Sequence, residues 1–293
     1  MDRPTSEAPP LVSVIIPTFN RLSLLKEAVH SVEEQTLTSW ELLVVDDGST
    51  DETWPWLESQ PHIRALRHPS RRGPAAARNE GAARAAAPYL AFLDSDDLFL
   101  PSKLQQQLNL LQAEPGLGLC HSNEIWLRTG RELKQKEKHE KRGGFIFEHC
   151  LPLCRISPSA AVMRRDVFLE LGGFDEELEI AEDYELWLRL TCNYPVGFID
   201  EPLVIKRGGH SDQLSLKYGQ IEKFRIEALC RVLRRANLSP AQRRAALDML
   251  HHKCEIYALG CAKRGRPEEA ERYRLLPAEL LSQRGVAATK IVM

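Results

Sequence analysis

Short apolar segments alternate with helical patterns along roughly the first 125 residues of the chain. The sequence is apolar almost without interruption at residues 11–16, 41–45, 89–93 and 117–120, and each segment has the length of a strand. Between these segments, apolar residues recur at helical spacing. Strands of this kind, joined by helices, are typical of a mostly parallel sheet with helices on both faces. We therefore expect an α/β domain over residues 11–215.

The C-terminal part of the chain, residues 216–293, has a wholly helical pattern. Its apolar positions need cover from another surface; they include Ile221, Phe224, Leu229 and Leu233. The segment around residues 257–270 resembles a single tetratricopeptide-like helical hairpin, which cannot bury its own apolar face. We expect these helices to dock on the preceding domain or on a partner.

Two further segments are expected to lie outside the core. Residues 1–10 are polar and contain prolines, which indicates a flexible N-terminus. Residues 131–142 carry six basic side chains and three acidic ones. This charge pattern predicts an exposed loop or hairpin with a solvated face.

Polar residues gather where the predicted strands end. Residues 18–20 follow the first strand, residues 46–49 follow the second, and residues 94–97 follow the third. In open α/β sheets, ligands bind beyond the carboxyl ends of the strands. The position of these three polar segments therefore predicts a ligand-binding site at that edge of the sheet.

Three aspartates, Asp94, Asp96 and Asp97, lie within four residues of one another after the third strand. Carboxylates at positions i and i+2 point the same way if the chain stays extended. A divalent cation would relieve their mutual repulsion, and hard oxygen ligands suit Mg²⁺ or Mn²⁺. The alternative is that Asp96 or Asp97 caps the N-terminus of the helix expected near Pro101.

A series of sequence motifs resembles that of the family 2 glycosyltransferases, which have the GT-A fold. The first four motifs cover the strand ends and an Ala-Arg-Asn-Glu-Gly segment; they lie at residues 14–20, 44–51, 77–81 and 92–97. The resemblance continues through Gly-Gly-Phe-Asp at 172–175 and the acidic segment at 181–189, so that it covers roughly residues 11–210. It implies an inverting, metal-dependent transfer of a sugar from a nucleotide-sugar donor, and it leaves the helical tail outside.

The resemblance also implies which residues bind the donor. Asp47 would accept a hydrogen bond from the base, with Pro17 and Thr18 against the nucleoside. Arg78 would pair with the ribose or the diphosphate, and Asn79 would help to order the metal-binding turn. The full donor set is Pro17, Thr18, Asn20, Asp47, Arg78, Asp94 and Ser95. Ser49 and Glu52 have the spacing of a capping box for the helix that follows.

The acidic pair Glu182-Asp183 resembles the family's catalytic motif at the start of a helix. Asp183 would be the general base that accepts the proton of the acceptor hydroxyl. The helix N-terminus favours its carboxylate form, whereas the neighbouring acidic residues disfavour it. His210 resembles the late histidine that returns to the metal or the diphosphate, which gives a metal set of Asp94, Asp96, Asp97 and His210.

Composition excludes few classes of protein. Hydrophobic residues make up 43% of the 293 residues, and the formal net charge of -2 offers no general attraction to nucleic acid. No apolar run reaches the roughly 18 residues that a membrane-spanning helix needs. The seven cysteines are scattered without zinc-site spacing. These features predict reduced thiols in a cytoplasmic protein, and they leave peripheral contact with the inner face of the membrane open.

The sequence indicates the type of reaction more clearly than it indicates the substrates. Asp47 leads us to expect a UDP-sugar, and family analogy suggests a carbohydrate or lipid-linked saccharide acceptor in polysaccharide biosynthesis. A nucleotidyltransferase is one alternative, although it would need a glycine-rich basic loop after the first strand. A catalytically dead scaffold protein that works through its helical tail is another, and the complete set of acidic residues argues against it.

Overall fold

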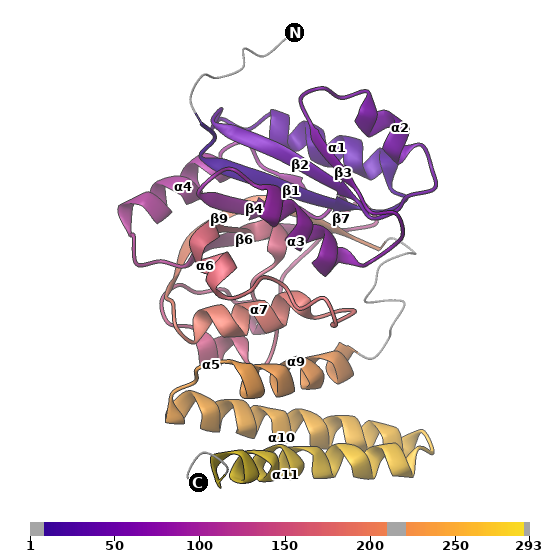
Figure 1. Cartoon of the computed structure of the whole chain (residues 1–293), viewed down its shortest axis with the longest axis vertical. Helices are drawn as coiled ribbons and strands as arrows, with labels where there is room; N and C mark the ends of the chain where they lie inside the picture. The colour runs from indigo at the N-terminus through magenta and orange to yellow at the C-terminus, as the bar shows by residue number, and fades with distance from the viewer. Residues whose placement is uncertain (1–8, 210–220, 290–293) are drawn as a thin grey trace.

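The computed structural model describes residues 9–209 and 221–289, and it is built around one nine-stranded mixed sheet with helices on both sides (Figure 1). The strand order is β3-β2-β1-β4-β8-β6-β9-β5, and β7 pairs with β6 outside this path. The predicted α/β fold is therefore confirmed.

The first part of the sheet is parallel, as the apolar strand pattern predicts. Its strands are β1 (Val12–Thr18), β2 (Trp40–Asp46), β3 (Arg64–Arg67) and β4 (Tyr89–Phe92), with β1 between β2 and β4. Alternate β1 side chains face opposite cores, since Val14 and Ile16 lie in one cluster and Ile15 in the other. Both faces are therefore covered. Because β1, β2 and β4 run parallel, the polar segments that follow them meet at one edge of the sheet.

The helices divide between the two faces of the sheet. One face is covered by α1 (Leu22–Glu33), α2 (Thr53–Glu58) and α4 (Lys103–Ala113). The other is covered by α3 (Pro74–Arg84), α5 (Phe147–Cys150), α6 (Arg165–Glu170) and α7 (Glu182–Thr191). Gly81 of α3 lies so close to β1 that an added Cβ would be 2.5 Å from a methyl carbon of Ile15. A glycine is needed there because helix and strand approach so closely.

The second part of the sheet is mixed, which the apolar pattern does not predict. Strand β8 (Ala161–Arg164) lies antiparallel between β4 and β6 (Leu119–Arg128), and β9 (Val196–Gly208) is parallel to β6. The short strands β5 (Leu98–Phe99) and β7 (Arg131–Leu133) pair antiparallel with β9 and β6. Strands β5, β7 and β8 have two to four residues each, too few for a hydrophobic period to be recognised.

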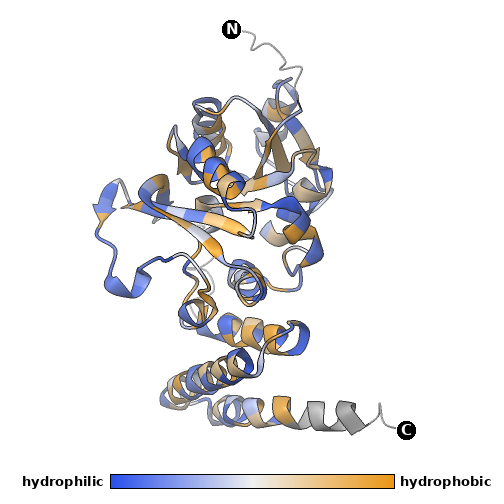
Figure 2. Cartoon of the chain, turned by 90° about the vertical axis from the view of Figure 1, so that its left-hand side faces the viewer, coloured by the Kyte–Doolittle hydropathy of each residue, from blue (hydrophilic) through white to orange (hydrophobic). Residues whose placement is uncertain are grey.

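Strand β7, which forms a hairpin with β6, and the residues after it make up the charged segment expected at 131–142. Most of its side chains are exposed. Figure 2 colours the ribbon by hydropathy, and this segment is mostly hydrophilic. Lys141 departs from the solvated face predicted for this segment. Its ammonium is buried and lies 3.0 Å from a carboxylate oxygen of Glu124, which is also buried. A buried charge is expensive unless it is paired, so this pair fixes the end of the segment against β6.

The described part of the tail, residues 221–289, forms three helices, α9 (Ile221–Arg235), α10 (Pro240–Lys263) and α11 (Pro267–Thr289), stacked below α7 and α5 in Figure 1. Helix α10 begins with a capping box between Ser239 and Gln242. The amide of Gln242 also donates to the carbonyl of Cys192 at 2.8 Å, and Lys253 donates to the carbonyl of Pro152 at 2.9 Å. Apolar residues of α9 and α10 belong to the same core cluster as those of α7, so the tail packs on the α/β domain.

Candidate active site

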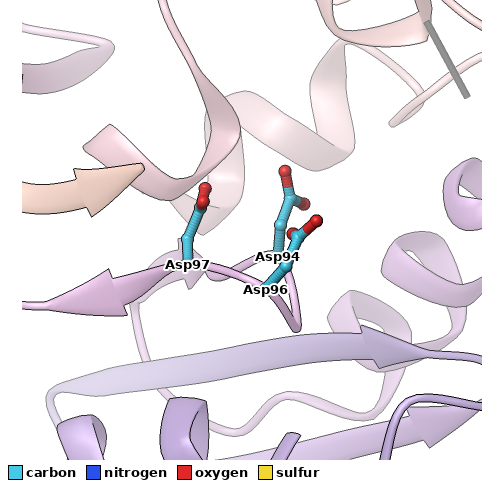
Figure 3. A group of neighbouring side chains, drawn as sticks. All are labelled: Asp94, Asp96 and Asp97. Carbon is cyan, nitrogen blue, oxygen red and sulfur yellow. The ribbon is translucent and has the colours of Figure 1, made fainter. Parts of the chain in front are cut away.

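The aspartate turn follows β4, and all three carboxylates point to the same side of the ribbon (Figure 3). One carboxylate oxygen from each of Asp94, Asp96 and Asp97 lies within 4.8 Å of the others. Helix α4 begins at Lys103 with Ser102 at its N-cap position, so neither Asp96 nor Asp97 caps it. The capping alternative is therefore wrong.

The three aspartates have different partners. Asp94 pairs with Arg78 at 2.6 Å, and Asp96 pairs with Arg21 at 2.9 Å. Asp97 is buried, and it accepts hydrogen bonds from the Ser159 hydroxyl at 2.6 Å and from the Arg207 backbone N–H at 2.9 Å. Burial, together with the charges of Asp94 and Asp96, raises the pKa of Asp97 to about 8. Asp97 thus joins the turn to β9, while Asp94 and Asp96 are better placed to meet a cation.

This group of carboxylates fits a hard divalent cation. Oxygen ligands in a compact cluster suit Mg²⁺ or Mn²⁺, which would also relieve the repulsion among the three aspartates. Arg78 and Arg21 already supply positive charge to Asp94 and Asp96, so they would share these carboxylates with the ion.

Asp47 lies directly after β2, where its carboxylate holds the loop that leads into α3. It accepts hydrogen bonds from His68 Nδ1 at 2.7 Å and from the backbone N–H groups of Arg72 and Gly73, both at 2.8 Å. Nearby in the sheet, the hydroxyl of Thr18 is buried without a hydrogen-bond partner among the described residues. An unsatisfied buried hydroxyl at a strand end is a natural contact for a ligand.

Asn20 joins the ends of β1 and β2 through hydrogen bonds. Its side-chain oxygen accepts from the Thr50 backbone N–H at 2.7 Å, and its own N–H donates to the Ser49 hydroxyl at 2.9 Å. Asn20 has a φ of 51°, a left-handed conformation that asparagine tolerates better than most residues. Helix α2 starts at Thr53 without a side-chain cap, so the expected capping box of Ser49 and Glu52 is wrong.

Arg78 is the central cation of the site. Its buried guanidinium lies 2.6 Å from Asp94 and 2.7 Å from Glu182, so it links the aspartate turn to the acidic pair of α7. Burial lowers the pKa of Arg78, but the charges of Asp94 and Glu182 outweigh this effect and raise it overall. Both contacts are made with protein carboxylates, so Arg78 holds the aspartate turn and the start of α7 together.

Asn79, next to Arg78, does not order the aspartate turn as expected. Its side chain accepts from the Phe174 N–H and donates to the Phe174 carbonyl, both at 2.9 Å. The preceding Gly173 has a φ of 73°, and an added Cβ would lie 2.6 Å from the Asn79 side-chain oxygen. Asn79 therefore fixes the Gly-Gly-Phe-Asp segment, which leads into α7.

Glu182 and Asp183 begin α7, as the acidic motif predicts. Ala181 before them is left-handed, with a φ of 66°. Glu182 is buried against Arg78, and burial together with Asp183 raises its pKa to about 7. Asp183 is half-buried; one carboxylate oxygen accepts from the Tyr184 N–H at 2.7 Å, and the other lies 3.4 Å from the Cys154 sulfur. Asp183 is thus the more accessible of the two acids.

A cavity of about 360 Å³ opens beside Asp183. Its lining comes from β6, β7 and the residues after it, the segment before β8, the start of α7, and β9 with the residue that follows it; it includes Trp126, His139, Arg155, Lys206 and Asp183. The ring centroids of Trp126 and His139 are 4.9 Å apart in an edge-to-face arrangement. The cavity therefore combines an aromatic wall and basic side chains with two carboxylates, Asp183 and Glu124, of which Glu124 is paired with Lys141.

Lys206 is a site residue that sequence reasoning missed. It lies 3.2 Å from the Ser157 hydroxyl. Burial opposes its charge, but the carboxylates of Glu124, Asp97, Asp94 and Asp183 raise the pKa of Lys206 overall. Its signal in the sequence is a lysine directly after the apolar run 203–205, at a position where a buried charge requires a partner.

The remaining predicted residues lie at this edge, with one exception. Pro17 is buried in β1, paired with Val45 of β2, and Ser95 is buried within the aspartate turn. His210 lies outside the described residues.

Comparisons with known proteins agree with the sequence motifs. The model of the family described as Glycosyl transferase family 2 matches residues 13–172. An uncharacterized glycosyltransferase of Rickettsia felis is 34% identical over 202 residues, which cover 66% of this chain and 32% of that protein. The chain thus spans about a third of the length of this curated relative. The UDP-Glc:alpha-D-GlcNAc-diphosphoundecaprenol beta-1,3-glucosyltransferase WfgD of Escherichia coli is 31% identical over 192 residues, 65% of this chain and 73% of that protein.

Solved structures share the fold at low sequence identity. Residues 1–349 of S. aureus TarS in complex with UDP-GlcNAc align with a TM-score of 0.71 at 20% identity, over 91% of this chain and 79% of that one. The mannosyltransferase PcManGT of Pyrobaculum calidifontis, in complex with GDP-Man and Mn²⁺, aligns with a TM-score of 0.62 at 18% identity, over 97% and 81% of the two chains. At these identities the likeness shows the fold alone.

Proposed function

Because the chain belongs to glycosyl transferase family 2, we propose that it transfers a sugar, with inversion, from a UDP-sugar to an acceptor hydroxyl, with Asp183 as the general base. One observation carries this proposal: Arg78 joins Asp94 of the aspartate turn to Glu182, the neighbour of Asp183. A carboxylate that suits a metal and a carboxylate that suits a base are thus held in one site.

The donor would bind at the edge formed by β1 and β2. Thr18 supplies a buried hydroxyl that has no hydrogen-bond partner in the described part of the chain, and Pro17 and Asn20 lie close to it in sequence. Asp47 would accept a ring N–H of uracil, and to do so it would have to share oxygens that now accept from His68, Arg72 and Gly73. The UDP assignment is supported by the donors named for WfgD and for the TarS complex.

A divalent cation, Mn²⁺ or Mg²⁺, would be held by Asp94 and Asp96 with Asp97, and His210 is proposed as a further ligand. When bound, such an ion neutralises charge on the donor diphosphate. Arg78 and Ser95 would border the same diphosphate. PcManGT, which shares the fold, is described in complex with Mn²⁺.

Asp183 would act on the acceptor. It accepts the proton of the acceptor hydroxyl while that oxygen attacks the anomeric carbon of the donor sugar. The bond from this carbon to the diphosphate oxygen breaks on the opposite face, which inverts the configuration and releases the nucleoside diphosphate. Glu182 is a poorer candidate for the base because its carboxylate is buried and is bound by Arg78. It is better suited to hold Arg78 in place.

The cavity beside Asp183 is the proposed acceptor site. Its aromatic wall suits a sugar ring, and its basic side chains suit a phosphate of a lipid-linked saccharide. WfgD, whose name specifies a diphosphoundecaprenol-linked acceptor, supports this class. We therefore propose a role in polysaccharide biosynthesis, in the cytoplasm and in peripheral contact with the inner face of the membrane. No helix among residues 9–209 and 221–289 is long and apolar enough to cross a bilayer.

A nucleotide-release assay tests the donor and the metal together. UDP-, GDP-, CMP- and dTDP-sugars would be incubated with the protein and a panel of saccharide acceptors, with Mn²⁺, with Mg²⁺ and with EDTA. We expect release from a UDP-sugar that depends on the metal and increases with an acceptor. Release that persists in EDTA would contradict the metal assignment, and preference for a GDP-sugar would contradict the donor assignment. Absence of release from all donors, with tail-dependent binding of a protein, would favour a scaffold.

A further inference from the structure

The thiol of Cys154 lies against Asp183 in the wall of the proposed acceptor cavity. Its sulfur is 3.4 Å from Asp183 Oδ2 and 3.2 Å from the backbone carbonyl oxygen of Ile156. The other Asp183 oxygen already accepts from the Tyr184 N–H. Cys154 thus supplies a side-chain donor to the carboxylate oxygen of Asp183 that does not accept from the Tyr184 N–H.

Cys154 is suited to remain a thiol in this position. Burial and the negative charge of Asp183 raise its pKa well above the usual value. The sulfur therefore keeps its single proton, which it can donate either to Asp183 or to Ile156. A charged acceptor makes a stronger hydrogen bond than a neutral carbonyl does, so the thiol should donate to Asp183 while that carboxylate is ionised.

We propose that Cys154 is a positioning residue for the base, donating its S–H to Asp183 Oδ2 in the resting enzyme and turning to the Ile156 carbonyl once Asp183 is protonated. This inference rests on the proposed role of Asp183. The sulfur keeps its proton throughout, and no bond to sulfur forms or breaks. The thiol would stabilise the carboxylate before attack and would release it when the acceptor proton arrives.

Other ionisable groups also act on Asp183, and they are unchanged by substitution of Cys154. Glu182 precedes Asp183 on α7 and is held by Arg78, and Lys206 faces it from β9. Cys150 lies close enough to Cys154 to add to its electrostatic environment. These groups set a constant background, so a difference between variants at position 154 reports the thiol itself.

The test is the pH dependence of kcat/KM for Cys154→Ala and Cys154→Ser. A hydrogen bond to the charged form of an acid favours that form. In Cys154→Ala we expect the acidic limb of the profile to move to higher pH by about 0.5 to 1 unit. This shift is smaller than the one an ordinary hydrogen bond to a charged group would give, because a thiol is a weak donor. Cys154→Ser keeps a donor and should restore the wild-type limb. Cys192→Ala serves as the matched control and should not move the limb, because it removes a buried core thiol whose hydrogen bond goes to the Arg189 carbonyl and not to Asp183.

Three outcomes would overturn the inference: an unchanged limb in Cys154→Ala, an equal shift in Cys192→Ala, or no rescue by serine. If Cys154→Ala does not fold, the comparison between wild type and Cys154→Ser remains, and a serine limb shifted to higher pH would contradict the proposal. Failure of the base assignment is recognised separately, because Asp183→Asn would then keep turnover close to that of the wild type.

Discussion

The two sides of the site are built differently. The proposed donor side, residues 12–97, takes its polar groups from short motifs directly after parallel strands, and each motif is contiguous in the sequence. The proposed acceptor side, residues 119–208, takes its groups from β6, β7, β9, the segment before β8 and the start of α7. Lys206 and Ser157, which touch there, are 49 residues apart. A donor site can thus be recognised from its motifs, whereas an acceptor site depends on pairings that only the fold reveals.

Substitution of the proposed base, on the acceptor side, should have the largest effect on activity. Asp183→Asn keeps the shape of the side chain and an oxygen that can accept from Tyr184, but it cannot accept a proton. We expect kcat to fall by about 10² to 10⁴ while donor affinity stays nearly unchanged. Steady-state kinetics and donor titration by calorimetry would measure the two quantities.

Glu182→Gln is the matched control for this experiment, because it alters the neighbouring acid. It should lower kcat less than Asp183→Asn does. If Glu182→Gln lowered kcat more than Asp183→Asn did, the base would be Glu182, and Arg78 would then contact the base itself.

Arg78→Met should break the link between the two sides. The substitution leaves Asp94 and Glu182 without their shared cation, and removal of one partner from a buried ion pair costs about 3 to 5 kcal/mol. Denaturant unfolding would measure this loss in the free energy of unfolding. Arg78→Lys keeps the charge but not the two-pronged geometry, so it should lose less stability. Equal losses for Met and Lys would show that shape, not charge, joins the sides.

The sequence predicts the donor side of the molecule better than the acceptor side. The strands β1, β2 and β4 and the three aspartates are recognisable because apolar runs and polar ends are local patterns. Strand β8 is not, because four residues have no period and its place between β4 and β6 is a long-range pairing. Lys141 belongs to a charged segment that has the composition of a protein surface, and only the folded structure brings it to Glu124. Asn79 likewise reaches Phe174, 95 residues away, and not the adjacent turn.

Asp96→Ala tests the donor side without disturbing the acceptor cavity. The metal is expected to contribute several kcal/mol to the stabilisation of charge on the diphosphate, so transfer should fall by about 10² to 10³. Donor binding should lose its dependence on Mn²⁺, which calorimetry with and without EDTA would show. Asp51→Ala, which removes an exposed acid near the same edge, is the control. A variant that still binds the donor in a metal-dependent way would place the ion elsewhere.

The smallest effect is expected from the buried pair of the acceptor side, and its pH dependence makes it distinctive. Burial raises the pKa of Glu124, but Lys141 and Lys206 outweigh this effect and lower it to about 2. An acid with a depressed pKa in the folded state stabilises that state above its unfolded pKa, about 4.3, and this contribution is lost as the pH falls toward 2. Glu124→Gln removes the charge and leaves Lys141 poorly compensated, so we expect a loss of about 1 to 3 kcal/mol at pH 7. The difference between wild type and variant should shrink below pH 4, as followed by unfolding at several pH values. A difference that stays constant from pH 7 to pH 3 would mean that Glu124 acts through packing, and that the acceptor side does not depend on this charge.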